Sequence, residues 1–263
     1  MRTSLSLLLL ALFVVACSKV PITGRRQVHM LPESQLMSMS LTQYQTFLTD
    51  NKTLDNGAVQ TRQVREVGNK IAKAAEKYLE DNGQSKRVKG FEWEFNVVDD
   101  PTVNAWCMPG GKVVFYTGIL PITKDANGIA VVMGHEIAHA IARHGNERMS
   151  QALAVQAGGI GLSVALQEKP ELAQGLLLQS YGVGSQLGML KFSRTHESEA
   201  DKMGLVFMAM AGYDPQGAPK FWERMSANGG QKPPEFLSTH PSDETRIKDL
   251  QEFMPEALKY YKK

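Results

Sequence analysis

The chain has 263 residues, a formal net charge of +2 and two cysteines. A charge this close to zero gives no basic surface of the kind that binds nucleic acid, so no nucleic-acid partner is expected. The length suffices for one large domain, or for one domain with a helical appendage.

The N-terminus has the pattern of a lipoprotein signal peptide over residues 1–16. A basic start is followed by an apolar run, residues 5–15, that is too short to cross a bilayer and ends just before Cys17. This ending resembles a bacterial lipobox, which implies cleavage before Cys17 and a lipid anchor on that cysteine. Ser18 after it resembles an outer-membrane sorting signal. We therefore expect a bacterial envelope protein on the periplasmic face of the outer membrane; the alternative is an ordinary secretion signal with a chance cysteine.

The second cysteine, Cys107, has no partner for an intramolecular disulfide if Cys17 carries lipid. Because it lies between Trp106 and Met108, we interpret it as small apolar packing. The alternatives are an inhibitory metal ligand or a resolving thiol.

The rest of the chain is expected to form a short N-terminal part and one main domain. Residues 17–60 are polar and loosely patterned, and are interpreted as the lipidated N-terminus, a tether and a first helix. Residues 61–263 form the main domain. Within it, helical spacing of apolar residues predicts a helix over 64–79, and alternation over 91–97 predicts a half-buried strand.

An extended segment, a Pro-Gly-Gly turn and a second strand are predicted over residues 104–118. Pro109 excludes a central strand position at that point. An exposed strand edge at Asn104 and Ala105 can hold an extended peptide by main-chain hydrogen bonds. A plain structural hairpin fits the pattern equally well.

An almost wholly apolar helix over residues 129–141, IAVVMGHEIAHAI, contains His135, Glu136 and His139. Residues four apart lie one turn above each other, so both imidazoles can bind one Zn²⁺ while Glu136 lies beside it as a general base. Burying such groups without partners costs several kcal/mol, and a metal ion is the simplest partner for all three. The motif therefore predicts hydrolysis of a peptide bond by metal-activated water.

Residues 147–192 are predicted to form a helical hairpin, because Lys169-Pro170 interrupts a mostly apolar helical segment. The apolar run over 152–166 is short for a bilayer span. We interpret the pair as a packed or lid-like insertion, with a peripheral membrane contact as the alternative.

A catalytic zinc needs a third protein ligand and an open position for water. Gly145 stands where a metzincin has its third histidine, which excludes that class. His144 is predicted to point away from the metal, because it lies about 140° around a continuous helix from His139. The better candidate is Glu197, with Asp201 one turn later accepting a hydrogen bond from a ligating imidazole.

The rival ligands in the same segment are His196 and Glu199. A solvated helix face is the alternative for all of its acidic residues. Ala200 is small enough to let the two helices approach closely.

Four ordered motifs then carry a resemblance that spans roughly residues 91–250: NAWCMPGGKVVFYTG, GHEIAHAIARH, ESEAD and THPSDETRI. Their order resembles the gluzincin-type zinc metallopeptidase family that includes the CAAX prenyl proteases, HtpX and periplasmic lipoproteins such as BepA. The resemblance implies one Zn²⁺ on His135, His139 and Glu197, with Glu136 as the base and Asp201 behind a ligand.

The same resemblance marks four further residues. It implies that Asn104 and Ala105 belong to the substrate-binding edge. It also marks His240, whose imidazole can donate a hydrogen bond to the oxyanion that forms as water attacks, and Arg246, which can fix that loop or pair with a carboxylate. Spacing alone describes these two as a loop histidine and a helix-surface arginine.

Two features of the family are missing from this sequence: the transmembrane helices of the prenyl proteases and HtpX, and the tetratricopeptide extension of the BepA-like members. A short single-domain lipoprotein member is therefore expected. Its expected fold is α+β and mostly helical, a zincin-type domain with a small sheet or hairpin beside the metal-binding helix.

The expected function is that of a zinc metalloendopeptidase that cleaves unfolded or misassembled envelope and outer-membrane proteins, with envelope assembly machinery as a further partner. The alternative is a non-proteolytic envelope chaperone or assembly factor. In that case a fourth ligand closes the zinc site: His196, Cys107 or a histidine of the 228–240 loop.

Overall fold

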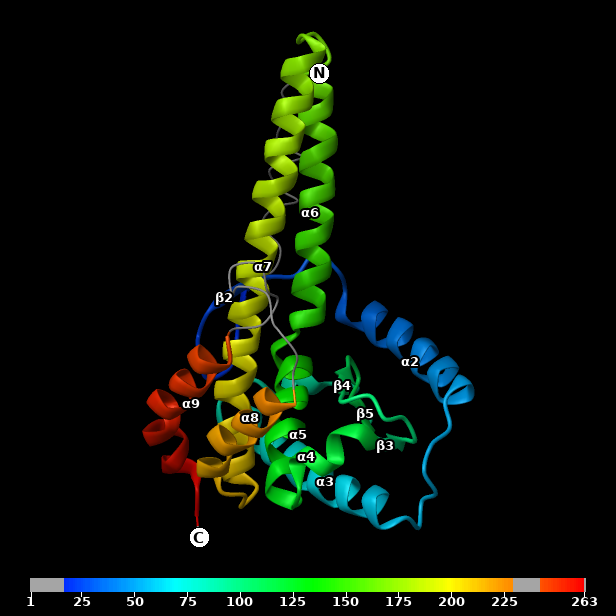
Figure 1. Cartoon of the computed structure of the whole chain (residues 1–263), viewed down its shortest axis with the longest axis vertical. Coiled ribbons are helices and arrows are strands. Elements are labelled where there is room, and N and C mark those ends of the chain that lie inside the picture. The colour runs from blue at the N-terminus through cyan, green and yellow to red at the C-terminus, as the bar shows by residue number, and fades with distance from the viewer. Residues whose placement is uncertain (1–16, 229–241, 263) are drawn as a thin grey trace.

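The computed structural model describes residues 17–228 and 242–262, and helices make up most of them (Figure 1). The predicted fold class, mostly helical with small sheets, is confirmed. The strands and α-helices are, in chain order, β1 Cys17–Lys19, β2 Arg26–Val28, α2 Glu33–Asp50, α3 Val59–Asp81, β3 Glu94–Val98, β4 Ala105–Met108, β5 Lys112–Tyr116, α4 Leu120–Thr123, α5 Ala126–Ala142, α6 His144–Ala165, α7 Glu171–Met210, α8 Ala218–Ala227 and α9 Asp243–Ala257.

The three-stranded sheet has the order β3-β5-β4, with β3 parallel and β4 antiparallel to the central strand. β5 is buried along almost its whole length, whereas β4 is half-buried along its whole length. The turn that contains Pro109 joins these two strands, so the proline takes no place in the ladder. β4 is thus an outer strand of the sheet, and it packs beside α5.

The centre of the fold is α5, which packs on α3, α7, α8 and β4. Its N-terminus is capped by the Asp125 side chain, which accepts a hydrogen bond from the Gly128 amide at 2.8 Å. Almost every later residue of the helix is buried. An apolar helix with this burial can hold polar side chains only where they have partners.

α5 and α7 touch through their backbones at Gly134 and Gly204. A Cβ atom on Gly134 would lie 2.8 Å from the Gly204 carbonyl oxygen, and one on Gly204 would lie 2.9 Å from the His135 amide nitrogen. Only glycine at both positions permits this approach. The contact places α7 directly against the helix turn that carries the His-Glu-x-x-His motif.

α6 and α7 run side by side away from the rest of the molecule (Figure 1). The turn between them includes Lys169 and Pro170, and α7 then returns into the core and continues to Met210. None of the described helices is long and apolar enough to cross a bilayer. Exposed apolar side chains along the two arms are Leu153, Ile160, Val164, Leu172, Leu176, Leu177, Val183, Leu187 and Phe192.

The N-terminal segment differs from the expected loose tether. β1 and β2 form an antiparallel hairpin in which Val20 and Gln27 are each only 1% exposed. Arg87 holds this hairpin from the other side, donating to Gln27 Oε1 at 2.9 Å and to the Ile141 carbonyl at 2.8 Å. Because several of these buried anchors are polar, hydropathy gives no sign that the segment belongs to the domain.

Candidate active site

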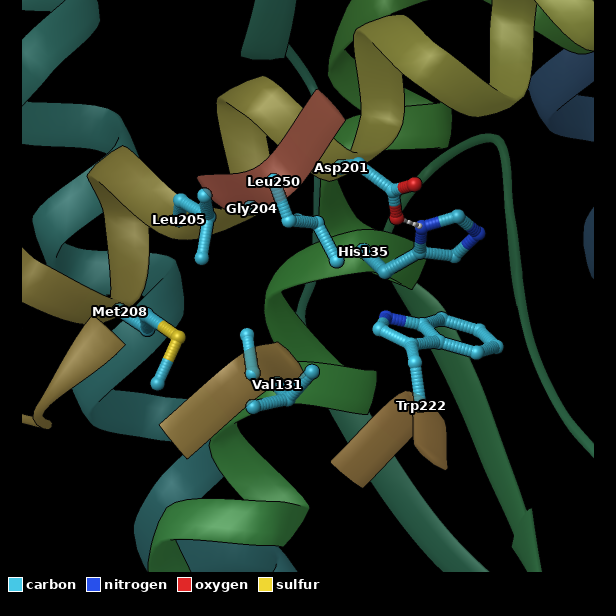
Figure 2. Close-up of a pocket in the computed structure, with 9 residues that line it drawn as sticks. Val131, His135, Asp201, Gly204, Leu205, Met208, Trp222 and Leu250 are labelled. Carbon is cyan, nitrogen blue, oxygen red and sulfur yellow. Dashed lines mark hydrogen bonds and ion pairs between the residues drawn. The ribbon is translucent and has the colours of Figure 1, made fainter. Parts of the chain in front are cut away.

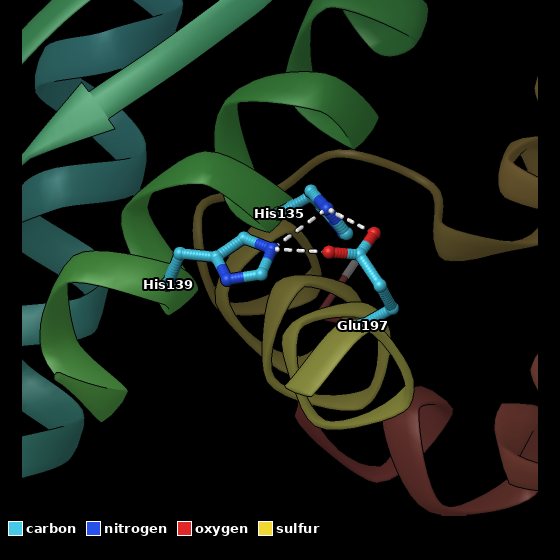
Figure 3. A group of neighbouring side chains, drawn as sticks. All are labelled: His135, His139 and Glu197. Atoms are coloured by element: carbon cyan, nitrogen blue, oxygen red, sulfur yellow. Dashed lines mark hydrogen bonds and ion pairs between the residues drawn. The ribbon is translucent and has the colours of Figure 1, made fainter. Parts of the chain in front are cut away.

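The two histidines of α5 and Glu197 of α7 converge on one point (Figure 3). The Nε2 atoms of His135 and His139 are 3.1 Å apart, and the Glu197 carboxylate oxygens lie 3.5 Å and 3.3 Å from them respectively. All three ligand atoms lie within 4.8 Å of one another. Ligand atoms at these distances can share one cation. Two imidazole nitrogens and one carboxylate oxygen form a donor set of catalytic zinc, so the residues fit Zn²⁺.

Asp201 supports His135 from behind (Figure 2). Asp201 Oδ1 accepts hydrogen bonds from His135 Nδ1 at 2.9 Å and from Arg246 Nη2 at 2.6 Å. The Arg246 guanidinium in turn lies 3.3 Å from the centre of the Trp222 ring. Burial opposes ionisation of Asp201, but Arg246 and His135 hold its pKa below the ordinary value. Asp201 therefore stays charged and fixes the ring orientation that presents Nε2 to the metal.

Asp201→Asn is expected to weaken Zn²⁺ binding by about 10–100-fold, because the amide accepts from His135 without a full charge and leaves Arg246 with the more distant Glu197 carboxylate at 3.6 Å. Competition with a chelator of known affinity measures this change. Asp50→Asn, at an exposed position on α2, is the matched control and should bind zinc like the parent. Parent-like affinity in Asp201→Asn would show that the carboxylate does not orient the ligand.

Glu136 lies on the same helix turn as the histidines and is partly exposed. Removal from water raises its pKa to about 7, against a smaller opposing influence of His135. The Cys107 thiol on β4 also has a raised pKa, through burial first and the Glu136 charge second. Glu136 thus lies on the helix that packs beside β4. A carboxylate with a pKa near neutrality is suited to accept and return a proton.

The helix that carries the motif ends earlier than the sequence indicates. Arg143 adopts a left-handed conformation with φ +60°, so α5 stops at Ala142 and α6 starts in a new direction at His144. His144 Nδ1 consequently lies 2.8 Å from His139 Nδ1. His144 is outside the metal group, as predicted, but it contacts His139 because the helix is not continuous, which the prediction had assumed.

The rival ligands His196 and Glu199 lie outside the metal group. Glu199 Oε2 lies 3.1 Å from His144 Nε2, and His196 Nε2 lies 3.0 Å from Glu147 Oε2. Each histidine thus pairs with the glutamate of the other helix, and the two imidazoles stack with centroids 4.3 Å apart. We call these four residues the His-Glu cluster.

Arg25 of the N-terminal hairpin joins the two glutamates of the His-Glu cluster. Its Nη1 and Nη2 donate to Glu147 at 2.7 Å each, and its Nε and Nη2 donate to Glu199 at 2.8 Å each. Burial opposes ionisation of both carboxylates. Hydrogen bonds from His144 and Arg25 nevertheless lower the pKa of Glu199 to about 2, and those from Arg25 and His196 hold the pKa of Glu147 well below its ordinary value.

The contribution of these carboxylates to stability is expected to depend on pH. A lowered folded-state pKa stabilises the fold above the ordinary value of 4.5, and this stabilisation is lost as pH falls towards about 2. The unfolding free energy of the parent should therefore exceed that of Arg25→Ala at pH 7, and the gap should narrow as pH falls from 7 to 3. Urea unfolding at pH 7, 5, 4 and 3 measures it, with Arg26→Ala as the exposed control. A gap that is unchanged at pH 3 would contradict the pairing.

Comparison with known proteins identifies the domain. The profile of Peptidase family M48 matches residues 58–254, three quarters of the sequence. The chain belongs to this family. The prediction of a metallopeptidase is thereby confirmed.

Relatives of this M48 protein come from eukaryotes and bacteria. The mitochondrial metalloendopeptidase OMA1 of Schizosaccharomyces pombe is 42% identical over 168 residues, covering 63% of this chain and 48% of its own. The human metalloendopeptidase OMA1 is 30% identical over 266 residues, 98% and 49% of the two chains. The beta-barrel assembly-enhancing protease of Escherichia coli is 29% identical over 163 residues, 60% and 33%. The M48 chain spans about half the length of the OMA1 relatives it matches.

The predicted localisation in a bacterial cell envelope is contradicted by these comparisons. Relatives that match most of the M48 chain, in Saccharomyces cerevisiae, Arabidopsis thaliana and human, are named as mitochondrial proteins. The envelope prediction depended on a short apolar run and one cysteine. That run lies in residues 1–16, outside the described part of the chain.

The remaining predicted site residues of the M48 domain are placed as follows. Ala105 opens the outer strand β4, and the Asn104 carbonyl accepts a hydrogen bond from the Tyr116 amide at 3.1 Å. Arg246 is buried beside Asp201 on α9, not on a helix surface. His240 lies outside the described residues. Cys107 packs against the core and is not in the metal group.

The sequence reasoning missed Trp222, the two-glycine contact and the role of the His-Glu cluster. One signal was present: His-x-x-Glu occurs at residues 144–147 and again at 196–199. Each pair places both side chains on one helix face, and an antiparallel pairing of the helices brings the two faces together.

Proposed function

We propose that this M48 protein is a zinc-dependent endopeptidase that cleaves extended segments of unfolded or misassembled proteins. The observation that carries the proposal is the outer strand β4 beside the helix of the metal group. An outer strand offers unpaired main-chain groups, and only a chain without its own secondary structure can pair with them. A folded protein has few such segments, so the site selects for unfolded ones. The names of two relatives, metalloendopeptidase and beta-barrel assembly-enhancing protease, support a proteolytic activity.

In the proposed mechanism, His135, His139 and Glu197 hold the metal, and bound Zn²⁺ would activate a water and polarise the scissile carbonyl. Glu136 accepts the proton of the attacking water and passes it to the leaving amine. Asp201 keeps the Nδ1 proton of His135 in place, so that Nε2 is available as a ligand. Asn104 and Ala105 align the substrate as a further strand.

The same proposal includes a role for His240, which lies outside the described residues, and a role for Cys17. His240 is proposed to donate a hydrogen bond to the oxyanion that forms during attack. Cys17 keeps its predicted lipid, which would hold the protein at a membrane surface.

The test compares two forms of one substrate: native ribonuclease A and its reduced, carboxymethylated form, which has the same sequence but cannot fold. The unfolded form should be cut at internal peptide bonds while the native form stays intact over the same time. A chelator should stop the reaction and added Zn²⁺ should restore it. Mass spectrometry of the products distinguishes internal cuts from trimming at the ends. Equal cleavage of both forms, or trimming alone, would refute the proposal.

A further inference from the structure

We propose that Arg25 is a positioning residue for the metal centre, acting on His139 through Glu199 and His144. This inference depends on the zinc site proposed above. Arg25 lies in the hairpin of β1 and β2, before residues 58–254 that match the family. The N-terminal segment would thus complete the metal site from behind the catalytic helix.

The first step is the chain of contacts that leads away from the metal. His139 Nε2 faces the other ligands, so in the neutral ring its proton is on Nδ1, which lies 2.8 Å from His144 Nδ1. His144 then accepts at Nδ1 and carries its own proton on Nε2, which donates to Glu199 Oε2 at 3.1 Å. Each ring nitrogen is thus either a donor or an acceptor, and the direction of both hydrogen bonds follows because the Glu199 carboxylate can only accept. His139 is therefore oriented by the Glu199 carboxylate through His144, whereas Asp201 contacts His135 directly.

The second step is why Glu199 needs Arg25. The side chains of Glu147 and Glu199 are only 4% and 5% exposed, and both are hydrogen-bonded to the same guanidinium. Two carboxylates this close and this buried cannot both stay ionised without a cation. The guanidinium plane offers its N–H groups as a fork and engages both oxygens of each glutamate. Without it, Glu199 would lose two of the hydrogen bonds that fix its carboxylate, and rotation of that carboxylate would release His144.

The third step is that the rest of the N-terminal hairpin supports the same two carboxylates. Thr23 Oγ1 donates to Glu199 at 2.8 Å, and Gln27 Nε2 donates to Glu147 at 3.1 Å and to the Ala142 carbonyl at 2.7 Å. The last contact reaches the end of α5, next to the left-handed turn that directs His144 back towards His139. Three side chains of one short segment thus converge on the His-Glu cluster, which a simple structural anchor would not require.

The experiment measures Zn²⁺ affinity by chelator competition in the full chain, with no substrate present. The variants are Arg25→Ala, Arg25→Lys, His144→Gln and the double variant Arg25→Lys/His144→Gln. The control is Arg26→Ala, which removes the same charge from the next residue, at an exposed position. Co²⁺ absorption spectra of the same proteins report the ligand geometry directly.

Arg25→Ala should bind Zn²⁺ about tenfold more weakly than the parent, within the range for residues that support a ligand. Arg25→Lys keeps the charge and should keep the fold, but one ammonium cannot form the fork, so its affinity should fall about threefold or more. Arg26→Ala should match the parent. In the His144→Gln background, Arg25→Lys should weaken Zn²⁺ binding no further, because the path to His139 is already broken. The Co²⁺ spectra of both Arg25 variants should differ from the parent spectrum.

Parent-like Zn²⁺ affinity and Co²⁺ spectrum in Arg25→Lys would overturn the inference, and so would equal losses from this change with and without His144. Either result would leave Arg25 as a structural anchor only. If Arg25→Ala fails to fold, the lysine variant and the double variant still decide. A parent protein that binds Zn²⁺ but cleaves nothing would refute the proposed function and leave this test intact.

Discussion

Glu136→Gln is expected to keep the fold and the zinc but to cleave unfolded substrate about 10³–10⁴-fold more slowly than the parent. The amide has nearly the shape of the carboxylate and cannot accept the proton of the attacking water. Glu136 is not in the ligand group, so metal affinity should stay within about threefold of the parent. Initial rates on carboxymethylated ribonuclease A, together with the zinc content of the same preparations, measure both quantities.

Glu223→Gln is the control for this change, because it makes the same substitution at an exposed position of α8. It should cleave at the parent rate. Retained cleavage by Glu136→Gln would remove Glu136 from its role as the base. Loss of zinc together with activity would instead show that the carboxylate holds the metal site together.

Gly204→Val is expected to lower the free energy of unfolding by about 3 kcal/mol and to weaken zinc binding at the same time. A Cβ atom there would lie 2.9 Å from the backbone of Gly134 and His135, and backbone atoms cannot move aside as a flexible side chain does. The two helices must separate, which moves Glu197 away from the histidines. Urea unfolding and chelator competition measure the two effects.

Gly184→Val provides the matched control on the same helix. A Cβ atom at Gly184 meets nothing within 4 Å, and the residue is exposed. We expect a change of less than about 1 kcal/mol and parent-like zinc affinity. If Gly204→Val behaved like Gly184→Val, the backbone contact would not determine the spacing of the ligands.

Local patterns in the sequence were sufficient for the mostly helical fold and for the common face of the two histidines. His135 and His139 are four residues apart on a helix whose apolar run is unmistakable, so their common face follows from helix geometry alone. Glu197 and Asp201 repeat that spacing on α7. Their approach to the histidines is a long-range contact, and the order of the family motifs indicated it, not hydropathy.

The parts that could not be predicted depend on single backbone events or on distant polar contacts. Arg143 gives no sign of its left-handed conformation, because glycine is the residue usually expected at that position of a helix end. Without that turn His144 cannot be placed. Arg25 and Glu199 are separated by 174 residues, and a polar segment pairing with buried carboxylates has no periodicity. Ala200 indicated a close helix approach, but the contact is made by Gly204, which is not distinguishable from other glycines in a helix.

The projecting hairpin has a consequence for how this sequence can vary in evolution. The hairpin residues that contact the metal centre or form the His-Glu cluster lie at the base of the hairpin, in the first turn of α6 and in the second half of α7. Among the described residues, the outer arms run beside each other and away from the rest of the molecule (Figure 1), so matched insertions or deletions of whole helical turns in both would leave the base in register. Homologous sequences can therefore have longer or shorter hairpins, with different apolar surfaces for binding, while the residues of the metal centre stay the same.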